Sequence, residues 1–465
     1  MEENSVKRDG FQSKWGFILA CIGSAVGMGN IWRFPIMVHK FGGLTFLLPY
    51  FIFVVLIGAS GVIEEFSLGR WAKAGPVGAF EKGCATKGKG NIGKVLGYIP
   101  IIGALMLAIG YTVVMGWIFK YTFLSITGEL YGMGTDMNVI GGTFGATAPE
   151  AGSLGEALSM MFSNGIFGVG NGVWQIIGLA VAVVIMVMGI AGGIEKANKV
   201  MMPILFALFV VLGIYIFTLE GSGVGYSYIF TLKPEGLANP QVWVFAFGQA
   251  FFSLSVAGNG SVIYGSYLSD DEDVVSSARN VAIFDTLAAL LAAFVIIPAM
   301  AVELGEGINS VGGGPGLMFV YLVNVFNAMP GGRIVGMIFY IAVLFAGISS
   351  IVNLYEAPIA FLQEELKLQR KPAVLIIAAI GIVVSLLIQP WTSQWMDVVS
   401  IYICPLGAAL AGAIFFFVMD RKDAEEAVGK GAKKPVFGAF WGLGKVYVIL
   451  AIIALVLGAY FGGIG

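Results

Sequence analysis

The sequence contains eleven apolar runs that are each long enough to cross a lipid bilayer, and this feature limits the possible folds most strongly. A helix needs about twenty consecutive apolar residues to span the hydrocarbon core. The runs cover residues 15–37, 43–70, 96–126, 173–191, 198–218, 241–267, 276–303, 333–362, 373–390, 395–419 and 438–462. Only 12% of the residues are charged and 58% are hydrophobic, which excludes an ordinary soluble domain. We therefore predict an all-α polytopic membrane protein with one transmembrane domain over residues 1–465.

The basic residues outside these runs predict the orientation of the chain. If the tail of residues 1–14 is cytoplasmic, twenty of the 26 Lys and Arg residues fall on the cytoplasmic side and four on the other. Cytoplasmic loops are enriched in Lys and Arg, so this bias predicts a cytoplasmic N-terminus. The net charge of −2 gives no sign of nucleic-acid binding.

Two of the apolar runs are interrupted by residues that a lipid-facing helix would not contain. The first interruption, Gly23–Pro35, holds three glycines, an asparagine, an arginine and a proline. The second, Ser253–Ser261, holds two glycines, an asparagine and three serines. Non-helical backbone at membrane depth is tolerated only where protein buries it or where it lines a cavity. We therefore predict two broken helices whose free backbone groups face a midplane binding site of a transporter.

The position of the broken helices predicts an internal repeat. Runs 1–5 (residues 15–218) and runs 6–10 (residues 241–419) each open with an interrupted run. Because five is an odd number, the second set must have inverted topology. The prediction is a 5+5 inverted repeat with broken helices 1 and 6, plus an eleventh helix at 438–462. We expect residues 128–172 to form an outer loop with short helices, and residues 303–332 an outer re-entrant lid.

Four motifs, in order and at the right spacing, resemble one family. They are the Gly-Asn-Ile-Trp-Arg-Phe-Pro core of the first interruption, Glu65 with Gly69-Arg70, Gly248–Ser255 and Phe345–Ser350. These residues resemble the neurotransmitter:sodium symporters over about residues 10–420, and most closely the eleven-helix bacterial members that transport amino acids. The resemblance implies a multi-pass protein of the bacterial inner membrane that binds two sodium ions.

The resemblance also implies which residues hold the two ions. The first sodium would be bound by the Ala25 carbonyl, the side chains of Asn30, Ser253 and Asp285, and the substrate carboxylate. The second would be bound by the carbonyls of Gly23, Val26 and Ala346 and by the hydroxyls of Ser349 and Ser350. A competing interpretation of the two serines is that their hydroxyls bond to carbonyls of their own helix.

Asp285 differs from the asparagine of the leucine-transporting members, and the residue four positions later is Ala289 in place of the serine of chloride-dependent members. Tyr50, Gln249 and Ser253 still match the chloride pocket of the family. A fixed anion at Asp285 would supply the charge that chloride otherwise brings, so we expect transport that is independent of chloride.

The substrate is predicted from Gly27, which stands where monoamine-transporting members carry an aspartate. Without a protein carboxylate there, the substrate should bring its own, which implies an α-amino acid bound near Gly27, Gly29 and the Tyr111 hydroxyl. Gly258 stands where a leucine-selective relative has phenylalanine, so a large neutral side chain, aromatic or branched, is expected. The predicted pocket comprises Ser24, Leu107, Tyr111, Val114, Phe252, Ser253, Ser255, Val256, Gly258, Asn259, Ser350, Asn353 and Leu354.

Charged residues at the two ends of this pocket are predicted to form gates. An unpaired arginine is costly at membrane depth, and the resemblance pairs Arg33 with Asp397 on the outer side, above an aromatic lid of Tyr111 and Phe252. On the inner side the resemblance pairs Arg8 with Glu364, near Tyr267. Gly193 and Pro203 match a pattern at the inner end of the fifth helix, where local unwinding would open a water path to the second sodium.

Three other functions compete with sodium-coupled import of amino acids. Protons could drive transport through Asp285 or Glu65, or the chain could be a sensor that binds an amino acid without moving it. An intramembrane enzyme would need a cluster of catalytic or metal-binding groups, and the sequence has one histidine, His39, and no such cluster. We therefore do not expect an enzyme.

Overall fold

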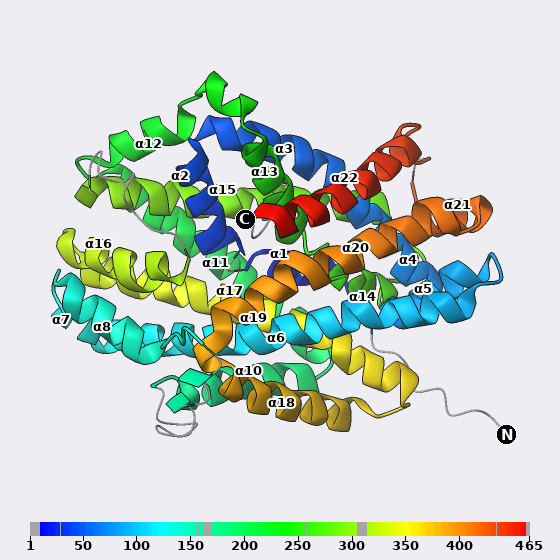
Figure 1. The fold of residues 1–465 in the computed structure, drawn as a ribbon, viewed down its shortest axis with the longest axis horizontal. Coiled ribbons are helices and arrows are strands. Elements are labelled where there is room, and N and C mark those ends of the chain that lie inside the picture. Colours follow the sequence, from blue (N-terminus) through cyan, green and yellow to red (C-terminus); the bar gives the residue numbers. More distant parts are fainter. Residues whose placement is uncertain are drawn as a thin grey trace.

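The fold was analysed in a computed structural model, which describes residues 10–27, 29–153, 155–156, 159–160, 170–256, 258–304, 314–433 and 435–461. Its described part is a bundle of helices without a strand (Figure 1). Long helices run side by side along the longest axis, as expected where backbone groups must be satisfied within each spanning segment.

Helices cover each of the eleven predicted apolar runs, with ends that differ from the predicted bounds by several residues. Runs 1–5 contain, in order, α1 (Lys14–Ala25), η1 (Gly29–Arg33) and α2 (Phe34–Phe41); α3 (Leu44–Gly58) and α4 (Gly61–Ala72); α6 (Gly90–Thr127); α10 (Gly172–Val187); and η2 (Ile190–Glu195) with α11 (Lys196–Phe217). Runs 6–10 contain α13 (Pro240–Ser253) and α14 (Gly260–Ser266); α15 (Val274–Leu304); α17 (Gly332–Glu365); α18 (Arg370–Leu387); and η6 (Gln389–Trp391), α19 (Thr392–Val398), η7 (Val399–Ile403), α20 (Cys404–Ala413) and η8 (Ile414–Val418). The eleventh run contains α22 (Phe440–Phe461). Within the described ranges, eight segments are long and apolar enough to span a membrane by themselves, and the bent pair α1–α2 makes a ninth.

Shorter helices gather at the two ends of the bundle. They are α5 (Pro76–Ala85), α7 (Glu129–Gly132), α8 (Met137–Thr147), α12 (Ser222–Phe230), η3 (Pro234–Ala238), η5 (Leu317–Tyr321), α16 (Leu322–Ala328) and α21 (Arg421–Gly429). Figure 1 shows α7, α8 and α16 at one end and α21 at the other. The predicted outer loop therefore does contain short helices, and η5 and α16 form the described part of the predicted lid, whose residues 305–313 lie outside the described ranges.

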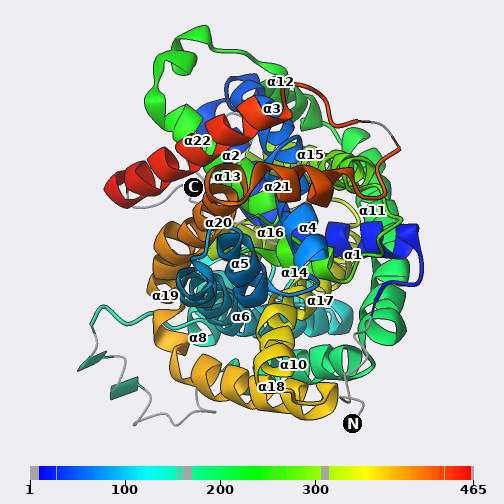
Figure 2. The ribbon, with the colours of Figure 1, turned by 90° about the vertical axis from the view of Figure 1, so that its right-hand side faces the viewer.

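Burial separates central helices from peripheral ones. The most apolar windows of α6 and α17 are 83% and 67% buried, whereas those of α18 and α22 are 33% buried. In the end-on view of Figure 2, α14 and α17 lie inside and α10, α18, α19 and α22 lie toward the periphery. The two least buried of these helices, α18 and α22, expose aliphatic side chains, as expected for surfaces that face lipid.

Both predicted breaks are present, and each has a local cause. The helix pair α1 and η1–α2 bends by 64° between Ala25 and Gly29. After α13, Ser255, Gly258 and Asn259 adopt φ angles of 56°, 103° and 56° before α14 begins. Positive φ angles are easily adopted by glycine and tolerated by asparagine, and they end the regular hydrogen-bond ladder. The residues Met28 and Ala257, inside the two breaks, lie outside the described ranges.

Candidate functional site

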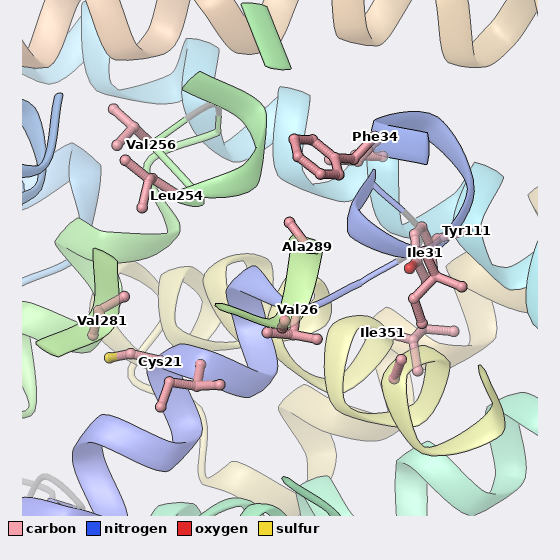
Figure 3. Packing of buried hydrophobic residues seen from close by; sticks show 14 of the residues in the cluster. Cys21, Val26, Ile31, Phe34, Tyr111, Leu254, Val256, Val281, Ala289 and Ile351 are labelled. Atoms are coloured by element: carbon pink, nitrogen blue, oxygen red, sulfur yellow. The ribbon is translucent and has the colours of Figure 1, made fainter. Parts of the chain in front are cut away.

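The two broken helices meet around a small cavity at the centre of the bundle. The Ser24 hydroxyl of the first broken helix donates to the Ser255 hydroxyl of the second at 3.3 Å. The cavity has a volume of about 60 Å³. Figure 3 shows the hydrophobic packing in this region, with Val26 before the first break, Leu254 and Val256 in the second, and Tyr111 and Ile351 from two neighbouring helices.

Most residues of the predicted pocket line this cavity. They are Ser24, Gly27, Gly29, Leu107, Tyr111, Phe252, Ser253, Ser255, Gly258, Ser350, Asn353 and Leu354. Ala25, Ala104, Gly260 and Ala357 also line it, and only Ala25 had been predicted, as a sodium ligand. Alanine and glycine carry no chemical signal, so the sequence could not have identified the other three as lining residues.

Three residues of the predicted pocket do not line the cavity. Val114 is buried on α6 among other apolar side chains, and Val256 is buried after the positive-φ residue Ser255. Asn259 donates its side-chain Nδ2 to Glu65 Oε1 at 2.8 Å, and is therefore used to hold α14 against α4. In this conformation these three residues therefore lie outside the lining of the cavity.

Gly27 is packed tightly against the cavity wall. A Cβ atom at this position would lie 2.5 Å from the Ser350 Oγ and 3.1 Å from the Tyr111 hydroxyl. A carboxylate side chain would therefore not fit at position 27. The Ser350 hydroxyl, in a residue that is 4% exposed, has no hydrogen-bond partner within the described ranges.

Asn30, Ser253 and Asp285 form one fully buried polar cluster. Asn30 Nδ2 donates to Asp285 Oδ1 at 2.6 Å, and the Ser253 hydroxyl lies 2.7 Å from Asp285 Oδ2 and 2.8 Å from Asn30 Oδ1. In the described part of the chain, no basic side chain forms an ion pair with Asp285. A buried carboxylate without a positive partner is strongly disfavoured, so this oxygen-rich cluster suits a small hard cation.

The residues of the predicted chloride pocket lie beside this cluster. Gln249 Nε2 donates to the Gly29 carbonyl at 3.0 Å, which ties α13 to the start of η1. The Gln249 Oε1 and the Tyr50 hydroxyl are buried and lack hydrogen-bond partners among the described residues. The amide of Gln249 is thus used in part to position the first break.

The second predicted set of ion ligands joins α1 to α17. A Cβ atom on Gly23 would lie 3.1 Å from Ser349 Cβ, so the two helices touch here. The Ser349 hydroxyl donates to the Ala346 carbonyl at 2.9 Å, which is the within-helix bond of the competing interpretation. Ala346 and Val26 are both buried at this contact. The Ala25 carbonyl accepts from the Gly27 N–H at 2.9 Å.

On the predicted outer side, Arg33 and Asp397 face the same cavity of about 850 Å³. No ion pair within the described ranges joins them. The Arg33 guanidinium carbon lies 5.2 Å from the centre of the Phe252 ring, a distance at which the ring face attracts a cation. The predicted outer gate residues are therefore brought to one cavity without being paired.

On the opposite side, a buried network joins the end of α14 to α17 and α18. Arg370 donates from Nη1 and Nη2 to the two carboxylate oxygens of Glu356 at 2.9 and 2.8 Å, and the Tyr267 hydroxyl donates to Glu356 Oε1 at 2.7 Å. Tyr267 was predicted at the inner gate, whereas Glu356 and Arg370 were not. A glutamate inside the apolar run 333–362 was the sequence signal for this pair.

The predicted inner pair lies partly outside the described ranges, because they begin after Arg8. Its partner Glu364 accepts the Gly75 N–H at 3.1 and 2.9 Å and so holds the start of α5. Gly193 lies in the π-helical segment η2, and Pro203 lies inside α11. A π-helical segment therefore precedes α11, whereas the helix is continuous through Pro203.

The model of the Sodium:neurotransmitter symporter family matches residues 8–139 and 153–419 of the sequence. This chain belongs to that family. The match includes both breaks, the Asn30–Ser253–Asp285 cluster and the Glu356–Arg370 pair.

Relatives with similar length support this assignment. An uncharacterized sodium-dependent transporter of Methanocaldococcus jannaschii is 31% identical over 98% of this chain and 93% of its own length. The sodium-dependent transporter YhdH of Bacillus subtilis, also uncharacterized, is 29% identical over 96% of both chains. The chain is accordingly a sodium-dependent membrane transporter of the symporter family.

A solved structure matches the fold over nearly the whole chain. The transporter MhsT, crystallised in complex with L-phenylalanine, is 31% identical, with a TM-score of 0.81 over 97% of this chain and 99% of that one. This similarity confirms the fold class predicted from the sequence.

Proposed function

We propose that this symporter imports neutral, hydrophobic or aromatic L-amino acids together with sodium, independently of chloride, by alternating access. The observation that carries this proposal is the buried Asn30–Ser253–Asp285 cluster, which holds a carboxylate without a basic partner in the described part of the chain, directly beside the cavity between the two broken helices.

The lining of the cavity supports a zwitterionic substrate. None of its lining residues is charged, and they include three alanines, two leucines and two aromatic rings, those of Tyr111 and Phe252. A free carboxylate and ammonium would therefore be bound by sodium, hydroxyls and backbone groups at the breaks. The exposed N–H groups at the start of a half-helix favour an anion.

The substrate class is supported by two relatives. MhsT was crystallised with L-phenylalanine. A sodium-dependent neutral amino acid transporter of Rattus norvegicus is 30% identical over 64% of this chain and 42% of its own length. Gly258 leaves room on the wall of the cavity, because a Cβ atom there would meet only the Cys404 Sγ at 3.7 Å.

We assign two sodium positions to the chain. The first is formed by the Ala25 carbonyl and the side chains of Asn30, Ser253 and Asp285. The second is formed by the carbonyls of Gly23, Val26 and Ala346 and the hydroxyls of Ser349 and Ser350. The hydroxyl of Ser350, which lacks a partner within the described ranges, is available as an oxygen ligand there.

Alternating access is supported by the different state of the two sides. The side of Arg33 and Asp397 has a cavity of about 850 Å³, whereas the side of Glu356 and Arg370 is closed by a bidentate ion pair. The irregular start of α11, with Gly193 and Pro203, provides a place where the closed side could open. We place this side, together with the N-terminus, at the cytoplasmic face of a bacterial inner membrane, a proposal that the excess of Lys and Arg in the loops of this side supports.

The test is uptake of radiolabelled L-phenylalanine into proteoliposomes. We expect uptake to stop when choline replaces sodium and to continue when gluconate replaces chloride. Uptake that continues in choline and follows a proton gradient would refute sodium coupling. Binding without uptake or counterflow would identify a sensor.

Chloride independence is tested by a double variant at Asp285 and Ala289. Asp285→Asn combined with Ala289→Ser should make uptake depend on chloride, because the fixed negative charge is lost and a neutral ligand set is created. Loss of wild-type uptake in gluconate would show that Asp285 does not replace chloride.

A further inference from the structure

Asn198 on α11 carries a buried amide that the proposed ligand sets do not use. Its side chain is 1% exposed. Nδ2 donates to the Ile194 carbonyl at 2.9 Å, whereas Oδ1 has no hydrogen-bond partner within the described ranges. Exchanging the two amide atoms would bring an oxygen against the Ile194 carbonyl, so the observed orientation of the amide is the favourable one.

The free oxygen of Asn198 points to the contact between α1 and α17. A Cβ atom on Gly23 would lie 1.9 Å from Asn198 Oδ1 and 3.1 Å from Ser349 Cβ. Only a glycine at position 23 allows this approach. Three helices thus meet here, and Oδ1 enters the small space beside Gly23 and Ser349.

The chemistry of this oxygen suits a cation. Nearly all buried polar atoms have a partner, and a buried acceptor without one is unfavourable. An amide oxygen is a ligand that hard cations accept, and α1 and α17 bring carbonyl and hydroxyl oxygens to the same place.

We propose that Asn198 supplies a further oxygen to the second sodium position, so that α11 contributes to this site along with α1 and α17. The inference rests on the proposed function, because it assumes that sodium binds between Gly23 and Ser349. It adds a third helix to the ligand set and links ion binding to the irregular start of α11.

A second contact lies close by, between the end of η2 and the residues directly before α1. Glu195, at the end of η2, accepts the Gln12 N–H and the Ser13 hydroxyl, both at 2.8 Å. The end of η2 is therefore attached at Glu195 to the residues directly before α1, and with sodium bound α11 would be attached to α1 itself at Asn198. Release of sodium would remove the second attachment and favour opening beside η2.

The experiment measures the sodium concentration that gives half-maximal L-phenylalanine binding to the purified full-length protein. Asn198→Ala should raise this concentration about threefold to tenfold, because one oxygen ligand is lost. Asn198→Asp should keep it at or below the wild-type value, because the oxygen is retained and a negative charge is added.

Asn171→Ala is the matched control. Asn171 is also fully buried, donates Nδ2 to a backbone carbonyl, that of Val113 at 3.0 Å, and has an Oδ1 without a partner among the described residues. It lies at the start of α10, away from Gly23, and its replacement should leave the sodium dependence unchanged.

A second readout avoids substrate altogether. Sodium alone should raise the melting temperature of the wild-type protein, since a ligand that binds only the folded state stabilises it. Asn198→Ala should need a higher sodium concentration for the same increase. Equal shifts in Asn198→Ala and Asn171→Ala, or no shift in either readout, would overturn the assignment of Asn198. A wild-type protein that ignores sodium in both readouts would instead overturn the proposed function.

Discussion

Replacing Glu356 by Gln should open the closed side of the bundle. The carboxylate of Glu356 is fully buried and accepts three hydrogen bonds, two from Arg370 and one from Tyr267. Glutamine keeps the shape of the side chain but leaves Arg370 without a counter-charge. Removing one partner of a buried ion pair costs about 3–5 kcal/mol.

The surroundings of Arg370 indicate that the cost of losing its counter-charge lies at the lower end of that range. The Arg370 side chain is 12% exposed, and its Nε also donates to the Met186 carbonyl at 2.7 Å. Part of its charge thus remains solvated and hydrogen-bonded after the substitution. We expect a loss of about 3 kcal/mol, which corresponds to about a hundredfold shift in population toward forms in which this side is open.

The assay is alkylation of a cysteine introduced at Ser266, at the end of α14, which is 2% exposed. The three native cysteines, all buried, would be replaced first. Glu356→Gln should increase the alkylation rate strongly. Glu425→Gln is the control, because Glu425 pairs with Arg421 on the surface, where both side chains are more than half exposed and such pairs contribute little.

The double substitution Glu356→Gln with Arg370→Gln tests the cause. If the unpaired charge is responsible, removing Arg370 as well should restore much of the protection, so that the effects are not additive. An alkylation rate in Glu356→Gln equal to that of the surface control, or strict additivity in the double variant, would refute the reasoning.

Three further predictions follow from other parts of the structure. Gly27→Ala should weaken L-phenylalanine binding at least tenfold in an equilibrium binding assay, because the added Cβ would lie 2.5 Å from the Ser350 Oγ. Arg33→Ala and Asp397→Ala should each reduce uptake, and the double variant should transport no worse than the single ones, whereas additive losses would show that the two residues act independently. Hydrogen bonds from two lysines lower the pKa of Asp270 to about 2, so its contribution to stability is complete above about pH 4 and is lost as the pH falls toward 2. Because its side chain is 46% exposed, Asp270→Asn should reduce the free energy of unfolding at pH 7 by less than about 1 kcal/mol, an effect that high salt removes in a thermal denaturation assay.

The spans and breaks could be predicted because their causes are local. The hydrophobic length of each span is set by its own residues, and the breaks are set by glycine, asparagine and proline within a dozen positions. The bend between Ala25 and Gly29 and the positive φ angles at Ser255 and Asn259 follow from these same segments. No tertiary contact was needed to place them.

The lining of the cavity was less predictable because it depends on how helices turn toward one another. Asn259 was expected in the pocket, yet its amide reaches Glu65 on another helix. Ala104 and Ala357 line the cavity although nothing in their chemistry distinguishes them from other alanines. Such assignments need the rotation of each helix, which the hydrophobic pattern of a buried helix does not specify.

The two predicted gates differ in whether their charged residues are paired, and the sequence alone could not reveal this difference. Charge balance alone suggests that Arg33 and Asp397 should pair, but in this conformation they face an open cavity while Glu356 and Arg370 are bonded. Under the proposed alternating access, Glu356 and Arg370 separate when their side of the bundle opens, while the outer side closes over Arg33 and Asp397. Exchange of one ion pair for another keeps the free-energy difference between the two conformations small. Binding of substrate and sodium can then shift the population, since a ligand moves an equilibrium only by its difference in affinity for the two states.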